Sequence, residues 1–311
     1  MRKFVFDLYD DVIRTEARVT NHFGIELSAD IYLPKSTGNQ KLAGIVVGGP
    51  YGAVKEQASG NYANELAHRG FVAVAFDGSF TGESGGNVRN VSSPDINTED
   101  FMAAVDLLGS QSNVDRNRIG ILGICGWGSF ALNAVSIDKR VKAVATVSMF
   151  DVSTLGAGNA TERSQQLDAL AKQRWQDIDD DVMHSGPDRF PNGYPDGESE
   201  QGKDVYDYYR TSRGFHENSI LSNGAWTATV AYPYMSNSLM QHIDEISPRP
   251  ILLIAGDKAN TKIFSQQAFE KANDPKELYI VKDAGHVTLY DRMGEGTLRK
   301  LQDFYTQYLQ V

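Results

Sequence analysis

The sequence predicts an α/β protein: one mostly parallel, doubly wound sheet of about eight strands with a helical lid insertion. Short apolar, β-branched runs alternate with helix-like segments, as they do in buried parallel strands and their crossover helices. An extended pair precedes this alternation, which stops after residue 150 and returns after residue 247. We therefore predict a single core domain from residues 1–150 and 248–311, with residues 151–247 as a lid or cap inserted into it.

The extended pair comes first, at residues 17–21 and 26–33, and the glycine between them and the proline after them are typical of an antiparallel hairpin. The parallel strands are expected at residues 42–47, 71–76, 118–124, 141–147, 251–255 and 278–281. Helices are expected between and after them, at residues 57–69, 98–108, 129–136, 264–272 and 297–309. A sheet covered by helices on both faces follows from this order.

The insertion contains a helix-like stretch at residues 165–178 and many aromatic side chains. These aromatics either shape a substrate pocket or fill a small core of the lid itself, and both interpretations stay open. They are Trp175, Tyr206, Tyr208, Tyr209, Trp226, Tyr232 and Tyr234. The acidic run at residues 177–181 lacks an EF-hand pattern, so a solvated lid surface explains it better than a calcium site.

Composition argues against several function classes. The chain has 311 residues, a net charge of −10 and a pI near 5.1, so neither nucleic acid nor an anionic membrane is an expected partner. Its longest apolar stretches are strand-sized, and Asp7, Asp10 and Asp11 interrupt the apolar N-terminal segment before a signal-peptide core can form. A single cysteine makes no internal disulfide. We expect a cytoplasmic protein with a small-molecule substrate and no metal or cofactor.

The most informative segment is the strand, sharp turn and helix start around Gly123-Ile124-Cys125-Gly126. A nucleophile elbow requires this arrangement, because the tight turn lifts a reactive side chain above the sheet edge. The start of the following helix lowers the pKa of a nearby thiol, and a neighbouring imidazole lowers it further. We therefore expect Cys125 to form a thiolate near neutral pH, against the alternative of an inert buried cysteine.

This elbow and four other segments, in this order along the chain, resemble the α/β-hydrolase superfamily, most closely its dienelactone-hydrolase-like branch with the YcjY-like and polyketide-transferase-like proteins. The other segments are the glycine-rich residues 48–52 and 77–86, Gly256-Asp257 and Ala284-Gly285-His286. The resemblance covers most of the chain outside the lid. It implies a catalytic triad of Cys125 as nucleophile, Asp257 as acid and His286 as base.

The same resemblance implies an oxyanion hole made by two backbone amides. One belongs to Gly126, directly after the nucleophile, and the other to a residue within 49–52. Pro50 has no N–H to donate, so Tyr51 is the predicted donor, with Gly52 as the next choice. Lys55 and Glu56 follow. Solvated charges at a helix start are the preferred interpretation of this pair, and a contact of Glu56 with the thiol is the alternative.

Trp127 departs from the family pattern, which has small residues after the nucleophile. It would either obstruct the elbow or line the substrate site, and Trp226 of the lid is a second expected substrate contact. The predicted function is hydrolysis of an ester, lactone or thioester carbonyl through an acyl-enzyme. The alternatives are acyl transfer by the same fold, or a catalytically inactive protein that binds a small molecule. A homodimer is possible, although no residue pattern locates its interface.

Overall fold

A computed structural model of the chain describes residues 4–36, 38, 40–191, 193–194 and 197–310. Its centre is one eight-stranded sheet in the order β1-β2-β4-β3-β5-β6-β7-β8. The strands are β1 (Val12–Thr20), β2 (Glu26–Pro34), β3 (Leu42–Gly48), β4 (Val72–Phe76), β5 (Val114–Ile124), β6 (Val141–Val147), β7 (Ile251–Gly256) and β8 (Lys276–Val281). Strand β2 is antiparallel to β1 and β4, and every other neighbouring pair is parallel. The predicted fold class is confirmed, and the predicted strands follow one another along the chain as expected, with boundaries shifted by a few residues.

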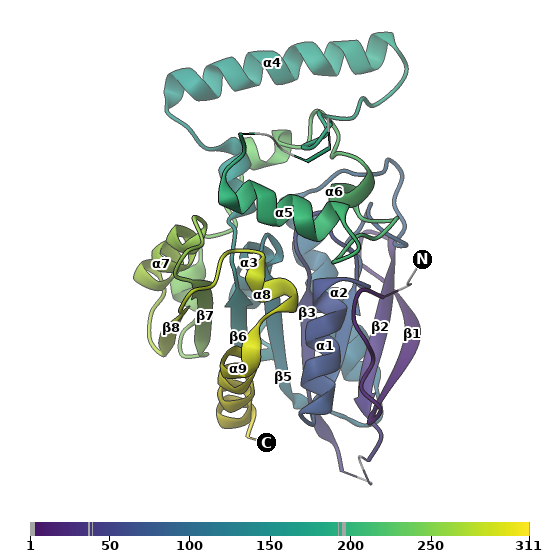
Figure 1. The fold of residues 1–311 in the computed structure, drawn as a ribbon, viewed down its shortest axis with the longest axis vertical. Coiled ribbons are helices and arrows are strands. Elements are labelled where there is room, and N and C mark those ends of the chain that lie inside the picture. The colour runs from purple at the N-terminus through teal and green to yellow at the C-terminus, as the bar shows by residue number, and fades with distance from the viewer. Residues whose placement is uncertain (1–3, 37, 39, 192, 195–196, 311) are drawn as a thin grey trace.

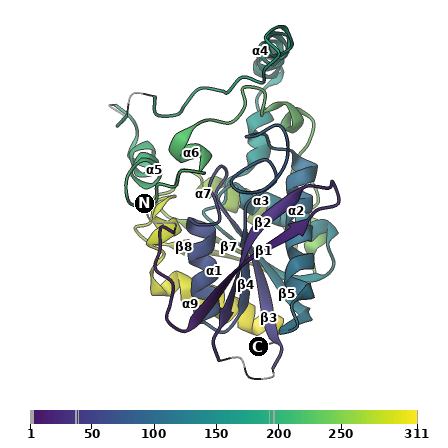
Figure 2. The same cartoon turned by 90° about the vertical axis from the view of Figure 1, so that its right-hand side faces the viewer.

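Helices cover both faces of this sheet, as Figures 1 and 2 show. Helices α1 (Ala58–His68), α8 (Thr288–Asp291) and α9 (Gly294–Leu309) contribute to one hydrophobic core. Helices α2 (Pro94–Ser110), α3 (Trp127–Ile137) and α7 (Lys262–Lys271) contribute to the other. The central strands β4 and β7 are buried at every position, which explains their continuous apolar sequence. The parallel strands end at a common edge, where their following loops meet.

The chain between β6 and β7 crosses above that edge (Figure 1). It contains the α-helices α4 (Ala160–Asp179), α5 (Glu200–Arg210) and α6 (Ile220–Asn223) and the 3-10 helices η1 (Val152–Gly156), η2 (Tyr232–Met235) and η3 (Ile243–Ile246). Figures 1 and 2 agree that α5 and α6 lie nearer the sheet and that α4 lies farthest from it. We call this segment the cap. Its exact limits stay a prediction.

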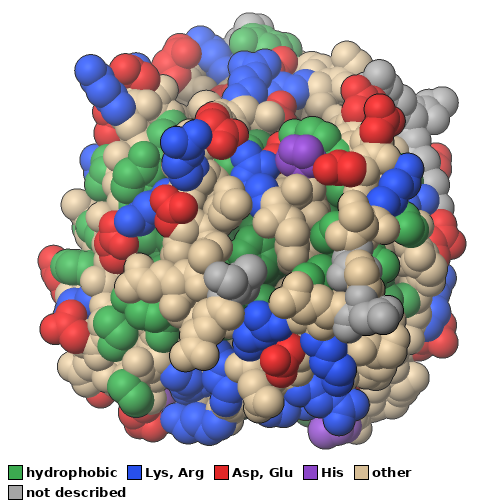
Figure 3. Space-filling model, turned by 90° about the horizontal axis from the view of Figure 1, so that it is seen from below, with side chains coloured by type: hydrophobic (Ala, Val, Ile, Leu, Met, Phe, Trp, Pro, Cys, Tyr) green, Lys and Arg blue, Asp and Glu red, His purple; other side chains and the backbone are tan. Residues whose placement is uncertain are grey.

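The opposite end of the molecule has a different character. Figure 3 views the protein from below and shows lysine and arginine side chains gathered on that face. A hollow of about 680 Å³ there is lined by Arg116, Lys139, Arg140 and Lys142, among others, at the starts of β5 and β6. This hollow lies at the opposite end of these strands from Cys125. In the part of the chain that the structure describes, no helix combines the length and apolar character needed to cross a bilayer.

Candidate active site

Cys125 occupies the turn between β5 and α3 with a positive φ of 54°. Few residues other than glycine adopt this left-handed conformation, and its strain is typical of functional turns. Gly123 makes the turn possible, because an added Cβ there would lie 2.4 Å from the Trp127 carbonyl oxygen. Gly126 has the same role on the other side, where a Cβ would lie 2.6 Å from the Tyr51 Cβ. The sequence therefore builds the strained elbow that was predicted for Cys125.

His286 meets the thiol from the loop after β8. Its Nε2 lies 3.3 Å from Cys125 Sγ and 2.9 Å from the hydroxyl oxygen of Tyr290. Gly256 at the end of β7 lets this loop approach, since a Cβ there would lie 2.1 Å from the Ala284 carbonyl oxygen. The imidazole is 5% exposed, so its polar partners are mostly protein groups. The structure thus brings together the predicted nucleophile and base, and it adds Tyr290 to them.

The other ring nitrogen has an unexpected partner. His286 Nδ1 lies 2.5 Å from Thr261 Oγ1, a residue that directly precedes α7. Asp257 was predicted for this place, but its Oδ1 is buried and hydrogen-bonded to no described group. If Nδ1–H donates a hydrogen bond to Thr261 Oγ1, the single lone pair of Nε2 is free to accept from either the Tyr290 hydroxyl or the thiol. In this conformation Thr261, rather than Asp257, orients the base.

Two backbone amides point at the sulfur. The N–H groups of Tyr51 and Gly126 both act as hydrogen-bond donors toward the Cys125 thiolate and favour its charged form. These are the two amides expected for an oxyanion hole. The loop that carries Tyr51 is fixed against the cap, because the Gly52 carbonyl accepts a hydrogen bond from the N–H of Ile220 at 2.9 Å. An anionic oxygen formed next to the sulfur would find the same donors preorganised.

Burial dominates the protonation of the pair. It raises the pKa of the Cys125 thiol, even though the hydroxyl of Tyr290 and the two amides favour the thiolate. It also lowers the pKa of His286 to about 4, and the positive charge of Arg189 acts in the same direction. The prediction of a thiolate near neutral pH is therefore wrong. The pKa of Cys125 is raised and not lowered, because desolvation outweighs the effect of the helix start. The resting site holds a neutral thiol beside a neutral imidazole.

This environment predicts slow alkylation of Cys125 at neutral pH. The rate of iodoacetamide labelling should keep rising above pH 8.5, the ordinary pKa range of a cysteine, because only the thiolate reacts. Intact-protein mass measured over time at each pH gives the rate, with free glutathione labelled in parallel as the reference thiol. A plateau below pH 7 would show that the site holds a thiolate and an imidazolium instead.

Trp127 neither covers the nucleophile nor lines the substrate site, so both expectations for it are wrong. Its ring is 8% exposed and packs against Phe76, Phe101 and Phe130 in the core beneath α2 and α3. Gly78 provides the space, since a Cβ there would lie 2.3 Å from the indole. The first turn of α3 directs this side chain into the core, away from the elbow.

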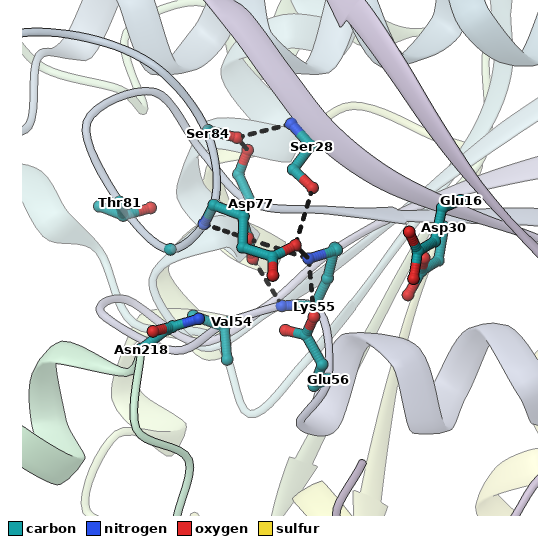
Figure 4. Close-up of polar contacts among 12 residues, drawn as sticks. Glu16, Ser28, Asp30, Val54, Lys55, Glu56, Asp77, Thr81, Ser84 and Asn218 are labelled. Carbon is teal, nitrogen blue, oxygen red and sulfur yellow. Dashed lines mark hydrogen bonds and ion pairs between the residues drawn. The ribbon is translucent and has the colours of Figure 1, made fainter. Parts of the chain in front are cut away.

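Lys55 and Glu56 are not solvated helix-start charges, because their side chains are only 2% and 1% exposed. Figure 4 shows Lys55 and Asp77 at the centre of a polar network. Lys55 Nζ lies 2.7 Å from Glu56 Oε1, 3.3 Å from Asp77 Oδ2 and 2.7 Å from Glu83 Oε2. Burial and Asp77 raise the pKa of Glu56 to about 7. The network joins residues 55–56 to the loop after β4.

Replacing Lys55 with methionine should destabilise the fold by about 3–5 kcal/mol, because it leaves the buried Glu56 and Asp77 carboxyl groups without their cation. Urea unfolding of wild type and Lys55→Met measures the loss. Lys139→Met, at an exposed position, is the matched control and should change stability by less than about 0.5 kcal/mol. Equal stability of both variants would show that the network is not needed for folding.

The cap aromatics divide between the two roles left open by the sequence. Tyr208 and Tyr209 of α5 pack edge-on against Tyr290 and are buried. Trp226 stacks on Tyr51 with ring centroids 4.1 Å apart, and it lines a cavity of about 280 Å³ with Leu221 and other cap residues. The remaining aromatics lie elsewhere: Tyr234 in the second core, Tyr206 against Phe190, Tyr232 near Arg174, and Trp175 on the surface.

Tyr290 and Thr261 contact His286 but were not predicted from the sequence as site residues. Tyr290 follows His286 by four residues, a spacing that places two side chains on one side of a helical turn, so this signal was available. Thr261 carries no comparable signal, because its hydroxyl reaches the imidazole only through the folding of the loop after β7. The alternative interpretation of Glu56, a contact with the thiol, is also replaced, because its carboxylate pairs with Lys55.

Comparisons with known proteins show the family of the chain. Residues 24–185 match the family model for the X-Pro dipeptidyl-peptidase (S15 family). The chain is 47% identical to the uncharacterized protein PA2218 of Pseudomonas aeruginosa over 98% of this chain and 83% of that protein. It is 32% identical to the uncharacterized protein YcjY of Escherichia coli over 88% of this chain and 90% of YcjY.

Solved structures extend the comparison to the fold. The crystal structure of PA2218 superposes with a TM-score of 0.94 at 46% identity, covering 98% of this chain and 96% of that one. The crystal structure of the α/β hydrolase GrgF from Penicillium sp. sh18 superposes with a TM-score of 0.78 at 20% identity, covering 96% of this chain and 100% of GrgF. GrgF is also named a polyketide transferase. These matches confirm the predicted superfamily, whereas the narrower dienelactone-hydrolase-like resemblance stays a prediction.

Proposed function

Because the chain belongs to the family described by the S15 model, within the α/β-hydrolase superfamily, we propose that it is a cysteine hydrolase of carboxylic esters or thioesters. The observation that supports this most is the position of Cys125 at a strained elbow, 3.3 Å from His286 Nε2. Two backbone amides directed at the sulfur complete an arrangement suited to acyl transfer. No step of this chemistry requires a cofactor.

In the proposed acylation, Sγ attacks the carbonyl carbon while the thiol proton moves to His286 Nε2. The thiol and imidazole start as a neutral pair, so proton transfer accompanies formation of the S–C bond. The amides of Tyr51 and Gly126 stabilise the oxyanion. His286 then protonates the departing alkoxide or thiolate, and the carbonyl re-forms as an acyl-enzyme thioester.

Deacylation repeats these steps with water. His286 takes a proton from the attacking water, the oxyanion again uses the two amides, and Cys125 leaves and regains its proton from the imidazolium. The acyl or alcohol portion would occupy the cap cavity, where Trp226 and Leu221 offer an apolar surface. A cavity of about 280 Å³ favours a compact group over a long extended chain.

Intact-protein mass spectrometry after brief mixing with p-nitrophenyl acetate, and separately with a short acyl thioester, tests the proposal. Wild type should gain one acyl group that decays as free acid appears, and Cys125→Ala should gain none. An adduct of equal size and lifetime on Cys125→Ala would place the acyl group elsewhere and overturn the assignment. Release of free acid without any Cys125-dependent adduct, when the reaction is sampled before the first turnover, would also count against it.

Acyl transfer to a small alcohol or amine is the second candidate, favoured by the similarity to GrgF, which is named a polyketide transferase. Acyl transfer proceeds through the same acyl-enzyme as hydrolysis. The two reactions differ only in the group, acceptor or water, that removes the acyl chain. Product yields measured with and without added acceptor separate the two functions. A hydrolase releases the same free acid in both, whereas a transferase diverts most of the acyl group to the acceptor.

Asp257 and Thr261 are expected to contribute unequally to catalysis by the base, His286. Thr261→Val should lower kcat/KM by ~10-fold through loss of one hydrogen bond to the imidazole, and Thr261→Ser should restore activity. Asp257→Asn should lower it less, because Thr261 and not Asp257 is the hydrogen-bond partner of His286 Nδ1. Steady-state kinetics of the variants provide the measurement. A loss of ~100-fold or more in Asp257→Asn would instead return Asp257 to the triad.

A further inference from the structure

We propose that α4 is the dimerisation helix of this protein and packs antiparallel against α4 of a second copy. The helix lies farthest from the sheet in Figures 1 and 2. Of its 20 residues only Leu170 is buried. A helix of this length spans ~30 Å, and few isolated helices in water gain enough stability without packing an apolar face. An additional partner for α4 would supply that packing.

The polar and apolar faces of α4 are the reverse of those expected for a surface helix of a monomer. The side facing the protein carries mainly polar residues: Arg163 donates to the Met235 carbonyl at 2.6 Å, Gln166 to the Leu155 carbonyl at 2.8 Å, and Asp177 lies 2.8 Å from His184 Nδ1. Large apolar side chains instead face solvent. Their exposed fractions are 37% for Leu167, 69% for Trp175, 68% for Ile178 and 50% for Val182 in the turn after the helix.

These apolar residues belong to a stripe that matches itself when reversed. The stripe consists of Ala160, Ser164, Leu167, Ala171, Trp175, Ile178 and Val182, spaced by 4, 3, 4, 4, 3 and 4 residues. This spacing keeps the helical members on one face and is symmetric about Ala171. A two-fold axis at Ala171 would place Leu167 of one copy beside Trp175 of the other.

Toward the ends of the stripe, the same axis pairs a small residue with a large one. Ser164 would meet Ile178, Ala160 would meet Val182, and the two small Ala171 side chains would let the helix axes approach closely at the centre. A two-fold interface must be complementary to itself, and this stripe satisfies that condition. Asp168 and Lys172, which share one flank of α4, would each face the opposite charge on the other copy.

Charge disfavours an anionic membrane as the occupant of this face. Helices that lie on membranes are rich in lysine and arginine, whereas Asp177, Asp179, Asp180 and Asp181 surround Ile178. Covering the four large apolar side chains of the stripe and their flanking residues would remove on the order of 500 Å² of surface per copy from water. Two copies together would therefore approach the roughly 1,200 Å² at the lower end of stable interfaces.

Cysteine cross-linking tests the predicted axis. In a Cys125→Ala background, Ala171→Cys should form an intermolecular disulfide under mild oxidation, because the two positions meet at the axis. Ala169→Cys is the matched control, since this exposed residue lies on the other side of the same helix. Non-reducing electrophoresis should show at least ten-fold faster dimer formation for Ala171→Cys. Equal rates for the two variants would overturn the proposed packing.

Sedimentation velocity tests the dimer itself. Wild type at micromolar concentration should sediment at twice the chain mass of 34.2 kDa, and Trp175→Glu should raise the dissociation constant by at least 100-fold. Trp175→Phe, which keeps an apolar ring, should remain dimeric. A wild-type monomer at 100 µM, or a Trp175→Glu dimer as tight as wild type, would contradict the proposal.

Discussion

Cys125→Ala should lower kcat for ester or thioester hydrolysis by at least ~10⁴-fold, because it removes the atom that forms the acyl-enzyme. The two amides and the cap remain in this variant, so residual activity should come from binding and oxyanion stabilisation alone. A loss of this size corresponds to about 5.5 kcal/mol of transition-state stabilisation. Stopped-flow release of p-nitrophenol under single-turnover conditions measures it.

The matched control is Cys125→Ser, which keeps a nucleophile of similar shape at the same positive φ. Serine should remain far below wild type, because its hydroxyl loses a proton much less readily than a thiol and the base is weak at a pKa of about 4. Both variants should unfold in urea within about 1 kcal/mol of wild type. Full turnover by Cys125→Ala would assign the chemistry to another residue.

The elbow was predictable because it depends on local sequence. Gly123 and Gly126 flank Cys125, and the apolar strand before them fixes which residue reaches the turn. The loops that carry His286 and Asp257 were predictable from strand order, since parallel strands bring their carboxyl ends to one edge. The topology of the sheet places these two loops at this edge, and that topology follows from the alternation of strands and helices along the chain.

The direction of individual side chains was not predictable in the same way. Trp127 turns into the core because Gly48 and Gly78, far away in sequence, leave room for its ring. Lys55 is buried because Asp77 folds back to meet it, although a lysine followed by a glutamate usually lies in solvent. Packing between distant segments decides such cases, and a single sequence carries little record of it.

His286→Gln should lower kcat by ~10³-fold, since the variant keeps polar atoms but has no base to accept the thiol proton. The wild-type rate should vary little between pH 5 and pH 8, because burial lowers the pKa of His286 to about 4 and keeps the base neutral over this range. A pH profile of kcat/KM tests both statements. A fall in the wild-type rate centred near pH 6.5 would indicate a solvated imidazole instead.

The same burial links His286 to acid stability. An unfolded histidine has a pKa of about 6.5, so between pH 6.5 and pH 4 the unfolded chain binds a proton that the folded chain does not. Acid therefore favours unfolding. His286 should lower the free energy of unfolding of wild type by about 2 kcal/mol at pH 5 relative to pH 8. Urea unfolding at both pH values should show that His286→Gln loses less stability than wild type by this amount. His22→Gln, whose wild-type side chain is 82% exposed, should behave like wild type. Equal acid sensitivity in wild type and His286→Gln would mean that the imidazole titrates normally in the folded protein, and the neutral resting pair would then be wrong.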